Sequence, residues 1–178
     1  MSSKNDLDAQ ITEEMISYFN IRTAEHIDRV KNNMILMEGY QNLDIQTLVK
    51  RGEIHDQSKM VEPEKQGYIW LTWWHYCKKQ GLKFDYPEGA QELVQLSVDH
   101  HLKSNLHHPE CHQKSNDMSW LDIVEMVCDW TAMSQEYDQG SCLSYVQQNI
   151  QKWHFNEQKM QDIFDTISEI DKRIQKKI

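Results

Sequence analysis

The sequence predicts an all-α protein, a single-domain bundle of about 6–8 helices that spans residues 1–178. Only 6 Gly and 3 Pro occur in the chain, so few turn-forming residues interrupt it, whereas many short strands would need more such breaks. No segment alternates between apolar and polar residues as a half-buried strand does. A chain of this length can bury one core of its own.

The first third of the chain is expected to contain three helices. After a flexible start over residues 1–6, we predict helices at Leu7 to Phe19 and at Arg22 to Gly39. Gly39 is suited to end the second helix, because glycine adopts the left-handed conformation that follows many helix ends. A short helix from Ile45 to Gly52 is expected next.

The middle of the chain predicts two longer helices and an irregular segment. Pro63 is well placed near the start of a helix that continues to about Gln80, because the missing N–H of proline needs no partner there. Three residues of this helix, Trp70, Trp73 and Trp74, are expected in the core, with a wall for stacking a base as the alternative reading. A helix from Gly89 to Lys103 follows, and the His-rich segment from Ser104 to Asp117 is expected to be irregular.

The last third predicts three more helices. Ser119 and Asp122 have the spacing of a capping box, which marks the start of a helix that runs to about Tyr137. Closing helices are expected at Leu143 to Lys152 and at Glu157 to Lys176.

Composition limits the classes of partner. With 19 basic and 28 acidic residues, the chain has a net charge of −9 and is not expected to bind nucleic acid by bulk electrostatics. No apolar run approaches the roughly 20 residues that span a bilayer, and the polar start does not resemble a signal peptide. The 4 cysteines form no C-x-x-C pair, so reduced thiols in a cytoplasmic protein are expected. Cys128 is expected to be a buried core residue and not a nucleophile.

A His-Asp dipeptide, His55-Asp56, is the most informative motif of the chain. Imidazole nitrogens and carboxylate oxygens are ligands that suit Zn, Mn or Fe. One more imidazole, His26, lies on an expected helix upstream, and Asp129 lies inside an expected helix downstream. Because helices of a bundle can direct such side chains to one point, the four residues predict a divalent metal site. Adjacent residues can share one ion only where the helix ends or bends, as expected just before Gln57.

Two acidic residues of the helix around Asp129 bear on this site. Asp129 lies in an otherwise apolar stretch, and a buried carboxylate needs a partner, for which a metal ion is suited. Glu125 lies one turn earlier, so it could act as a general base or support a ligand. The alternative is that Glu125 is an acidic residue on the helix surface.

Three segments of the chain carry a family resemblance: IHDQSKM, HHLKSNLHHPE and MSWLDIVEMVCDW. Together with the H…HD…D order, they resemble the HD superfamily of metal-dependent phosphohydrolases, which are all-α domains. Within it, the chain looks like a family of short bacterial and phage proteins with no assigned function. The resemblance covers most of the chain, from about His26 to the last helix.

The resemblance implies a set of metal ligands and a cofactor of one or two divalent ions (Mn, Fe, Zn, Mg or Ni/Co). By that likeness the first ion is held by His26, His55, Asp56 and Asp129. Relatives with two ions add two His between the HD pair and the last Asp, and here the candidates are His101 and either His107 or His108. His100 is less suited than His101. Lys59 resembles a position that contacts phosphate, with a solvent-facing Lys as the alternative.

The His100–His112 run leaves other readings open. It could be a solvated polar loop, or a His cluster that binds phosphate without a second metal ion. A separate structural zinc site that combines Cys111 and His112 with His107 or His108 is also conceivable, although the second half of a finger-like spacing is missing.

The resemblance implies a metal-dependent phosphohydrolase, with Asp56, Lys59 and Glu125 as the residues predicted to take part in catalysis. Its metal-activated water would attack a phosphomonoester, most plausibly a nucleotide or related small molecule. One alternative is a di-iron oxygenase on the same scaffold, and another is a non-catalytic, metal-stabilised module that binds a partner protein. The substrate, the metal and the formation of a homodimer stay open at this point.

Overall fold

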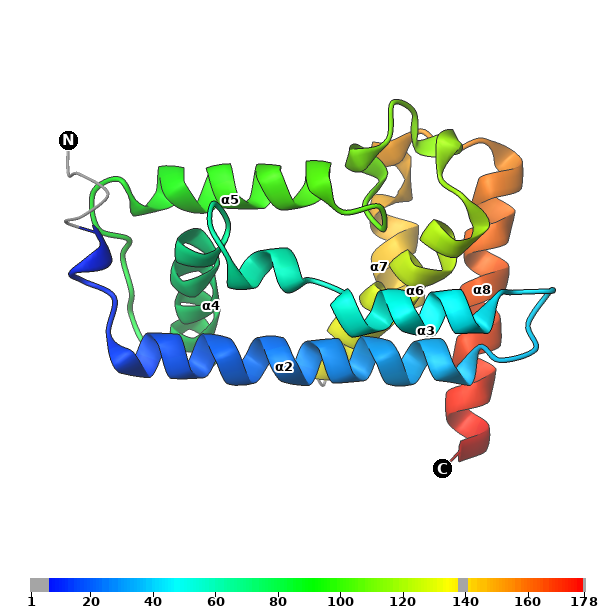
Figure 1. The fold of residues 1–178 in the computed structure, drawn as a ribbon, viewed down its shortest axis with the longest axis horizontal. Helices are drawn as coiled ribbons and strands as arrows, with labels where there is room; N and C mark the ends of the chain where they lie inside the picture. The colour runs from blue at the N-terminus through cyan, green and yellow to red at the C-terminus, as the bar shows by residue number, and fades with distance from the viewer. Residues whose placement is uncertain (1–6, 138–140, 178) are drawn as a thin grey trace. The chain divides into compact units, whose positions relative to one another are not determined.

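The computed structural model describes residues 7–137 and 141–177, which contain seven α-helices and no strand (Figure 1). The predicted all-α class and helix number are therefore confirmed. The expected flexible start, residues 1–6, lies outside the described residues. The chain divides into two compact units, Met1–Glu25 with Asp56–Ser104 and His26–His55 with Asn105–Ile178, and each is described by itself. One domain over residues 1–178 stays a prediction.

The first long helix, α2 (Glu13–Leu36), is the blue helix of Figure 1 and contributes residues to both units. It begins after Thr12, whose Oγ1 accepts a hydrogen bond from the Met15 N–H at 3.2 Å. The predicted break between Phe19 and Arg22 is wrong. Neither Gly nor Pro lies in this stretch, and Asn20 and Ile21 have intermediate helix propensities that do not end a helix stabilised by packing. The helix ends three residues before Gly39, whose φ of +75° serves the turn that follows.

The first unit packs α2, α4 (Lys65–Lys79) and α5 (Ala90–Ser104) around a small core. The buried residues of this core are Leu7, Met15, Phe19, Ile69, Trp70 and Ala90. Trp70 is thus a core residue as predicted, Trp73 is partly buried against it, and Trp74 is half-buried.

Both ends of α4 are set by turn residues. Pro63 lies near the start of the helix as predicted, two residues before Lys65. The intervening turn is closed by the Glu64 N–H, which donates to the Val61 carbonyl at 3.1 Å. Gly81, with φ of +67°, ends the helix as predicted.

The helices α4 and α5 approach each other at Gly67. A Cβ atom on this residue would lie 2.2 Å from Ser97 Oγ and 2.8 Å from the Leu93 carbonyl oxygen. Ser97 also donates a hydrogen bond to the Pro63 carbonyl at 3.1 Å. The close crossing therefore depends on the absence of a side chain at position 67.

The second unit is built around α6 (Trp120–Glu136), with α3 (Ile45–Ile54), α7 (Cys142–Asn149) and α8 (Glu157–Lys177). Every residue of α6 from Asp122 to Ala132 is buried. A helix covered on all sides is usually apolar all round, yet this one takes three carboxylates into the interior: Asp122, Glu125 and Asp129. They are the basis of the candidate site.

The predicted start of α6 is confirmed. The Asp122 N–H donates to Ser119 Oγ at 3.2 Å, and the Ser119 N–H donates to Asp122 Oδ2 at 2.7 Å, which completes a capping box. The segment before it is irregular as predicted, apart from two short 3-10 turns, η2 (Pro109–Cys111) and η3 (Ser115–Asp117). After α7, a 3-10 turn, η4 (Ile150–Trp153), continues the predicted seventh helix.

Candidate metal centre

The His55-Asp56 dipeptide lies where α3 ends, as the metal hypothesis requires. The helix stops at Ile54, His55 has φ and ψ of −53° and 133°, and Asp56 adopts the left-handed conformation with φ of +58°. Aspartate is one of the few residues that adopt this conformation at modest cost. Both side chains are almost fully buried, and the two residues belong to different units.

Three predicted ligands of the second unit come together. His26 from α2, His55 after α3 and Asp129 from α6 each offer one ligand atom, and these atoms lie within 4.8 Å of one another. His26 Nε2 lies 3.0 Å and His55 Nε2 lies 3.8 Å from Asp129 Oδ1. We call these three residues the triad. All are buried.

The electrostatics of the triad favour a charged carboxylate. Burial would raise the pKa of Asp129, but His26 and His55 outweigh this effect and hold the pKa of Asp129 well below its usual value. The carboxylate is therefore ionised at neutral pH, which is the form that binds a metal ion.

Glu125, one turn before Asp129, contacts the ring of His55 from the other side. His55 Nδ1 lies 3.0 Å from Glu125 Oε1, and His107 Nδ1 lies 3.5 Å from the same oxygen. Burial would raise the pKa of Glu125, but the hydrogen bond with His55 and the neighbouring charges lower it below its usual value. Glu125 is thus a buried residue beside a triad ligand, and the alternative of a surface acid is wrong.

Arg51 completes this side of the site and was not predicted from the sequence. Its Nη2 lies 2.7 Å from Asp122 Oδ1, and its Nε lies 2.5 Å from Glu125 Oε2. Two spacings could have indicated it. Arg51 precedes His55 by four residues at the end of one helix, and the carboxylates of α6 recur at a helical interval on one face of an apolar helix.

The His-rich segment contributes His107 to the second unit. His107 is buried, and its ring centroid lies 4.3 Å from that of His55 and 4.1 Å from that of His108. His112 Nε2 instead donates to the Leu106 carbonyl at 2.8 Å. Among the described residues, no group of metal-binding geometry includes Cys111 or His112, so the structural zinc reading gains no support.

The predicted site residues of the first unit form a second polar cluster, which we call the Asp56 cluster. His101 Nε2 lies 3.1 Å from Asp56 Oδ1, and Lys59 Nζ lies 2.5 Å from Asp56 Oδ2. The Lys59 ammonium also lies 4.8 Å from the centroid of the Tyr68 ring. Lys59 is therefore paired within the protein, in contrast to the solvent-facing reading.

Glu64, which was not predicted from the sequence either, contacts Nδ1 of two histidines beside this cluster. Its Oε2 lies 2.9 Å from His101 Nδ1 and its Oε1 lies 2.7 Å from His100 Nδ1, while Ser58 Oγ donates to Oε2 at 2.8 Å. Burial would raise the pKa of Glu64, but the hydrogen bonds of the two His and of Ser58 lower it. The side chain of His100 is 43% exposed, whereas that of His101 is 3% exposed. This difference favours His101 as the ligand.

Within the part of the chain that the structure describes, the same arrangement thus occurs in both units. In both, a buried Glu lies against Nδ1 of a buried His, while Nε2 of that ring faces a buried Asp. The residues are Glu125, His55 and Asp129 in one unit and Glu64, His101 and Asp56 in the other. Imidazole ligands of metals are typically oriented in this way by a partner of the second ring nitrogen.

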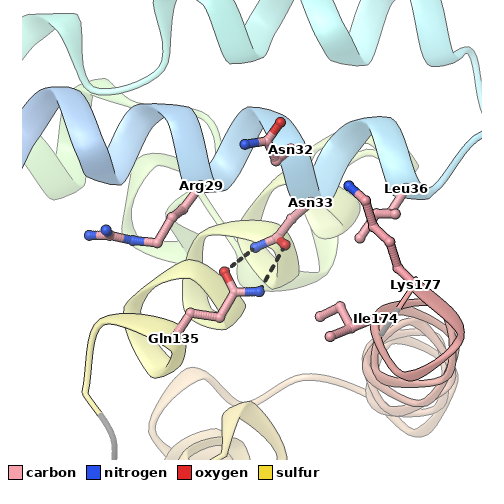
Figure 2. A pocket seen from close by; sticks show the side chains of 7 residues that line it. All are labelled: Arg29, Asn32, Asn33, Leu36, Gln135, Ile174 and Lys177. Carbon is pink, nitrogen blue, oxygen red and sulfur yellow. Dashed lines mark hydrogen bonds between the residues drawn. The ribbon is translucent and has the colours of Figure 1, made fainter.

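A pocket of about 410 Å³ lies elsewhere in the second unit (Figure 2). Figure 2 shows Asn33 of α2 and Gln135 of α6 joined by two hydrogen bonds at its edge. Its walls are formed by Arg29, Asn32, Asn33, Leu36, Gln135, Ile174 and Lys177. None of the predicted site residues lines this pocket.

The described helices include none that combines the length and the apolar character needed to cross a bilayer. The four cysteines are free thiols, and burial raises the pKa of Cys128 well above its usual value, in agreement with a core residue.

Comparisons with known proteins give a family but no activity. The model of a family of unknown function, DUF5662, matches residues 15–176. Searches of curated proteins and of solved structures found no significant match. The match includes every residue of the triad and of the Asp56 cluster. The chain therefore belongs to the DUF5662 family, a family of unknown function.

Proposed function

We propose that the protein is a metal-dependent phosphohydrolase whose metal centre is built on the triad, His26, His55 and Asp129. The observation that carries the proposal is the convergence of three buried ligand atoms within 4.8 Å of one another. Two imidazoles and one carboxylate form a donor set that catalytic metal sites use, because three protein ligands leave a position for water or substrate.

The chemistry follows from the donor set. A divalent ion at the triad would lower the pKa of a bound water and polarise a phosphoryl oxygen, which hydrolysis of a phosphomonoester requires. In the chain itself, Asp129 supplies the negative charge, and Glu125 holds the ring of His55 by its Nδ1 atom. An acidic protein can bind an anionic substrate in this way, because positive charge is supplied locally.

Asp56, His101 and Lys59 have proposed roles that rest on the sequence resemblance. We include Asp56 as a ligand because it follows His55 directly and is buried. His101, with His107 or His108, would serve a second ion, and Lys59 would contact the phosphate of the substrate. The proposed substrate is a nucleotide or a related small phosphomonoester.

Elemental analysis of protein purified without added metal, combined with phosphate release from a panel of nucleotides and other phosphomonoesters, tests the proposal. We expect at least about one divalent ion per chain, and phosphate release that is lost in Asp129→Asn. A ratio near two would support the second ligand set. Asp165→Asn is the control, because Asp165 is an exposed carboxylate of α8, outside the triad and the Asp56 cluster, that accepts a hydrogen bond from the exposed Gln161 side chain at 2.8 Å.

Three outcomes would contradict the proposal. Wild-type protein that binds no divalent ion would remove the metal centre altogether. Metal-loaded protein that releases no phosphate, and whose Asp129→Asn variant loses only stability, would indicate a non-catalytic metal-stabilised module. Bound iron with oxygen consumption and no phosphate release would indicate the di-iron oxygenase.

A further inference from the structure

Arg51 bridges two buried carboxylates of α6 from the end of α3. Its side chain is 20% exposed, and its guanidinium contacts Asp122 and Glu125 through different nitrogens at 2.7 and 2.5 Å. Guanidinium groups suit such a bridge, because they present several N–H donors in a fixed plane. The contact holds the Glu125 carboxylate through its Oε2 atom.

Glu125 uses its two oxygens for two different partners. Oε2 contacts Arg51, and Oε1 lies 3.0 Å from Nδ1 of His55. A carboxylate held through Oε2 by the Arg51 guanidinium has only acceptor atoms to offer to the ring of His55. Nδ1 of His55 must therefore carry the proton in this contact, and in the neutral ring the lone pair lies on Nε2.

The lone pair of Nε2 is directed into the triad. Nε2 of His55 lies on the side of Asp129 Oδ1, at 3.8 Å, and the ring lies beside that of His26 with 5.7 Å between the centroids. We propose that Arg51 is a positioning residue, which acts through Glu125 to fix His55 as the Nδ1–H tautomer with Nε2 directed at the metal position. This inference rests on the proposed metal centre and adds Arg51 to it.

The same contacts assign Glu125 a positioning role in place of general base. Its Oε1 lies 3.0 Å from His55 Nδ1 and its Oε2 lies 2.5 Å from Arg51 Nε, so both oxygens have partners within the protein. Asp122, the other partner of Arg51, also caps α6. Loss of Arg51 therefore affects the start of α6 as well, and a second variant is needed to separate the two effects.

The test uses two-bond ¹H–¹⁵N NMR spectra of the metal-free, 178-residue protein, which report the tautomer of each histidine. The variants are Arg51→Met and Glu125→Gln. Arg29→Met is the matched control, because Arg29 also pairs with a carboxylate of α6, but with Glu136 at the far end of the helix, at 3.3 Å. Thermal unfolding of each variant shows whether it folds.

For wild type and for Arg29→Met, we expect the proton of His55 on Nδ1. In Arg51→Met and Glu125→Gln we expect a mixture of tautomers, and an affinity for Zn²⁺ or Mn²⁺ lower by about 10- to 100-fold, as for loss of other partners of ligating histidines. The metal affinity of Arg29→Met should stay within about twofold of the wild-type value, because the carboxylate that Arg29 contacts, Glu136, does not belong to the proposed metal centre.

Two results would overturn the role of Arg51. One is a wild-type His55 with its proton on Nε2. The other is a folded Arg51→Met protein whose tautomer and metal affinity match those of the Arg29→Met control. Because the spectra are recorded on metal-free protein, they decide this role even if the wild type binds no metal, which is the separate result that would refute the proposed function.

Discussion

Lys59 has contacts in the structure that neither reading of the sequence predicted. Its ammonium lies against Asp56, a carboxylate that is 1% exposed, and above the Tyr68 ring. A cation that neutralises a buried carboxylate and faces an aromatic ring is held in one place. The proposed contact with a phosphate therefore has to be tested against a role in holding Asp56.

Substitution of Lys59 by Met separates the two roles. If Lys59 contacts the substrate phosphate, KM rises by about tenfold while kcat changes little, because the contact is made in the ground state and transition state alike. The measurement is steady-state phosphate release, with Lys83→Met as the control, since Lys83 pairs with Asp85 at the surface. An unchanged KM with a lower unfolding temperature would assign Lys59 to Asp56 alone.

The thiols also make a prediction at this scale. Cys128 and Cys142 are buried in the core of the second unit, and burial raises the pKa of Cys142 to about 12. Thiolates are the reactive form. At pH 8, iodoacetamide should therefore modify the partly exposed Cys111 first, and the two core cysteines only after unfolding, as measured by mass spectrometry. Equal labelling rates in native protein would contradict the buried positions.

At the scale of helices, the sequence predicted most elements but not how far they extend. Gly81 and the Ser119 capping box mark helix ends by local backbone chemistry, which is readable from neighbouring residues. Asn20 and Ile21 were read as a break, whereas α2 continues through them. Local propensity is a weak guide where packing on both sides holds a helix together.

The residues of the candidate site likewise fall into those that the sequence predicts and those that only the structure reveals. His26, His55, Asp56 and Asp129 are predictable because few residue types bind metals and their order is characteristic. Arg51 and Glu64 were missed, because an Arg or Glu on a helix is usually solvated, and their contacts exist only once separate segments pack. The choice of His101 over His100 likewise needed burial, which adjacent sequence positions do not reveal.

The crossing of α4 and α5 makes a prediction at this scale. Gly67→Ala should destabilise the protein by about 1–3 kcal/mol, because the added methyl group meets Ser97 Oγ and the Leu93 carbonyl oxygen, and backbone cannot move aside cheaply. Urea unfolding measures the effect. In the double variant Gly67→Ala/Ser97→Gly, the Ser97 side chain that the new methyl group would meet is removed. A Gly67→Ala protein as stable as wild type would show that the helices do not cross this closely.

For the molecule as a whole, buried carboxylates link stability to pH. Glu64, Asp122, Glu125 and Asp129 are buried, which by itself would raise their pKa, yet hydrogen bonds and nearby cations hold each pKa below its usual value. Three of them lie in α6, and two of these, Asp122 and Glu125, share Arg51 as a partner. The folded protein thus resists protonation at these four positions.

The consequence is a loss of stability in acid. Because each folded pKa is lower than the unfolded value of about 4, the unfolded chain binds more protons below that value. The contribution is fully present above about pH 5 and decreases as the pH falls through 4 toward the folded values. Urea midpoints of the metal-free protein between pH 7 and pH 3 measure it. A urea midpoint that increases as the pH is lowered from 7 to 3 would contradict the charged state of these groups.

The left-handed backbone of Asp56 has a consequence for the design of variants. At φ of +58°, a replacement by Ala adds a conformational cost to the loss of the carboxylate, so lower activity or stability would have two causes. Asparagine accepts this conformation as readily as aspartate and keeps its shape. Asp56→Asn is therefore the exchange that isolates charge at the second half of the His-Asp motif.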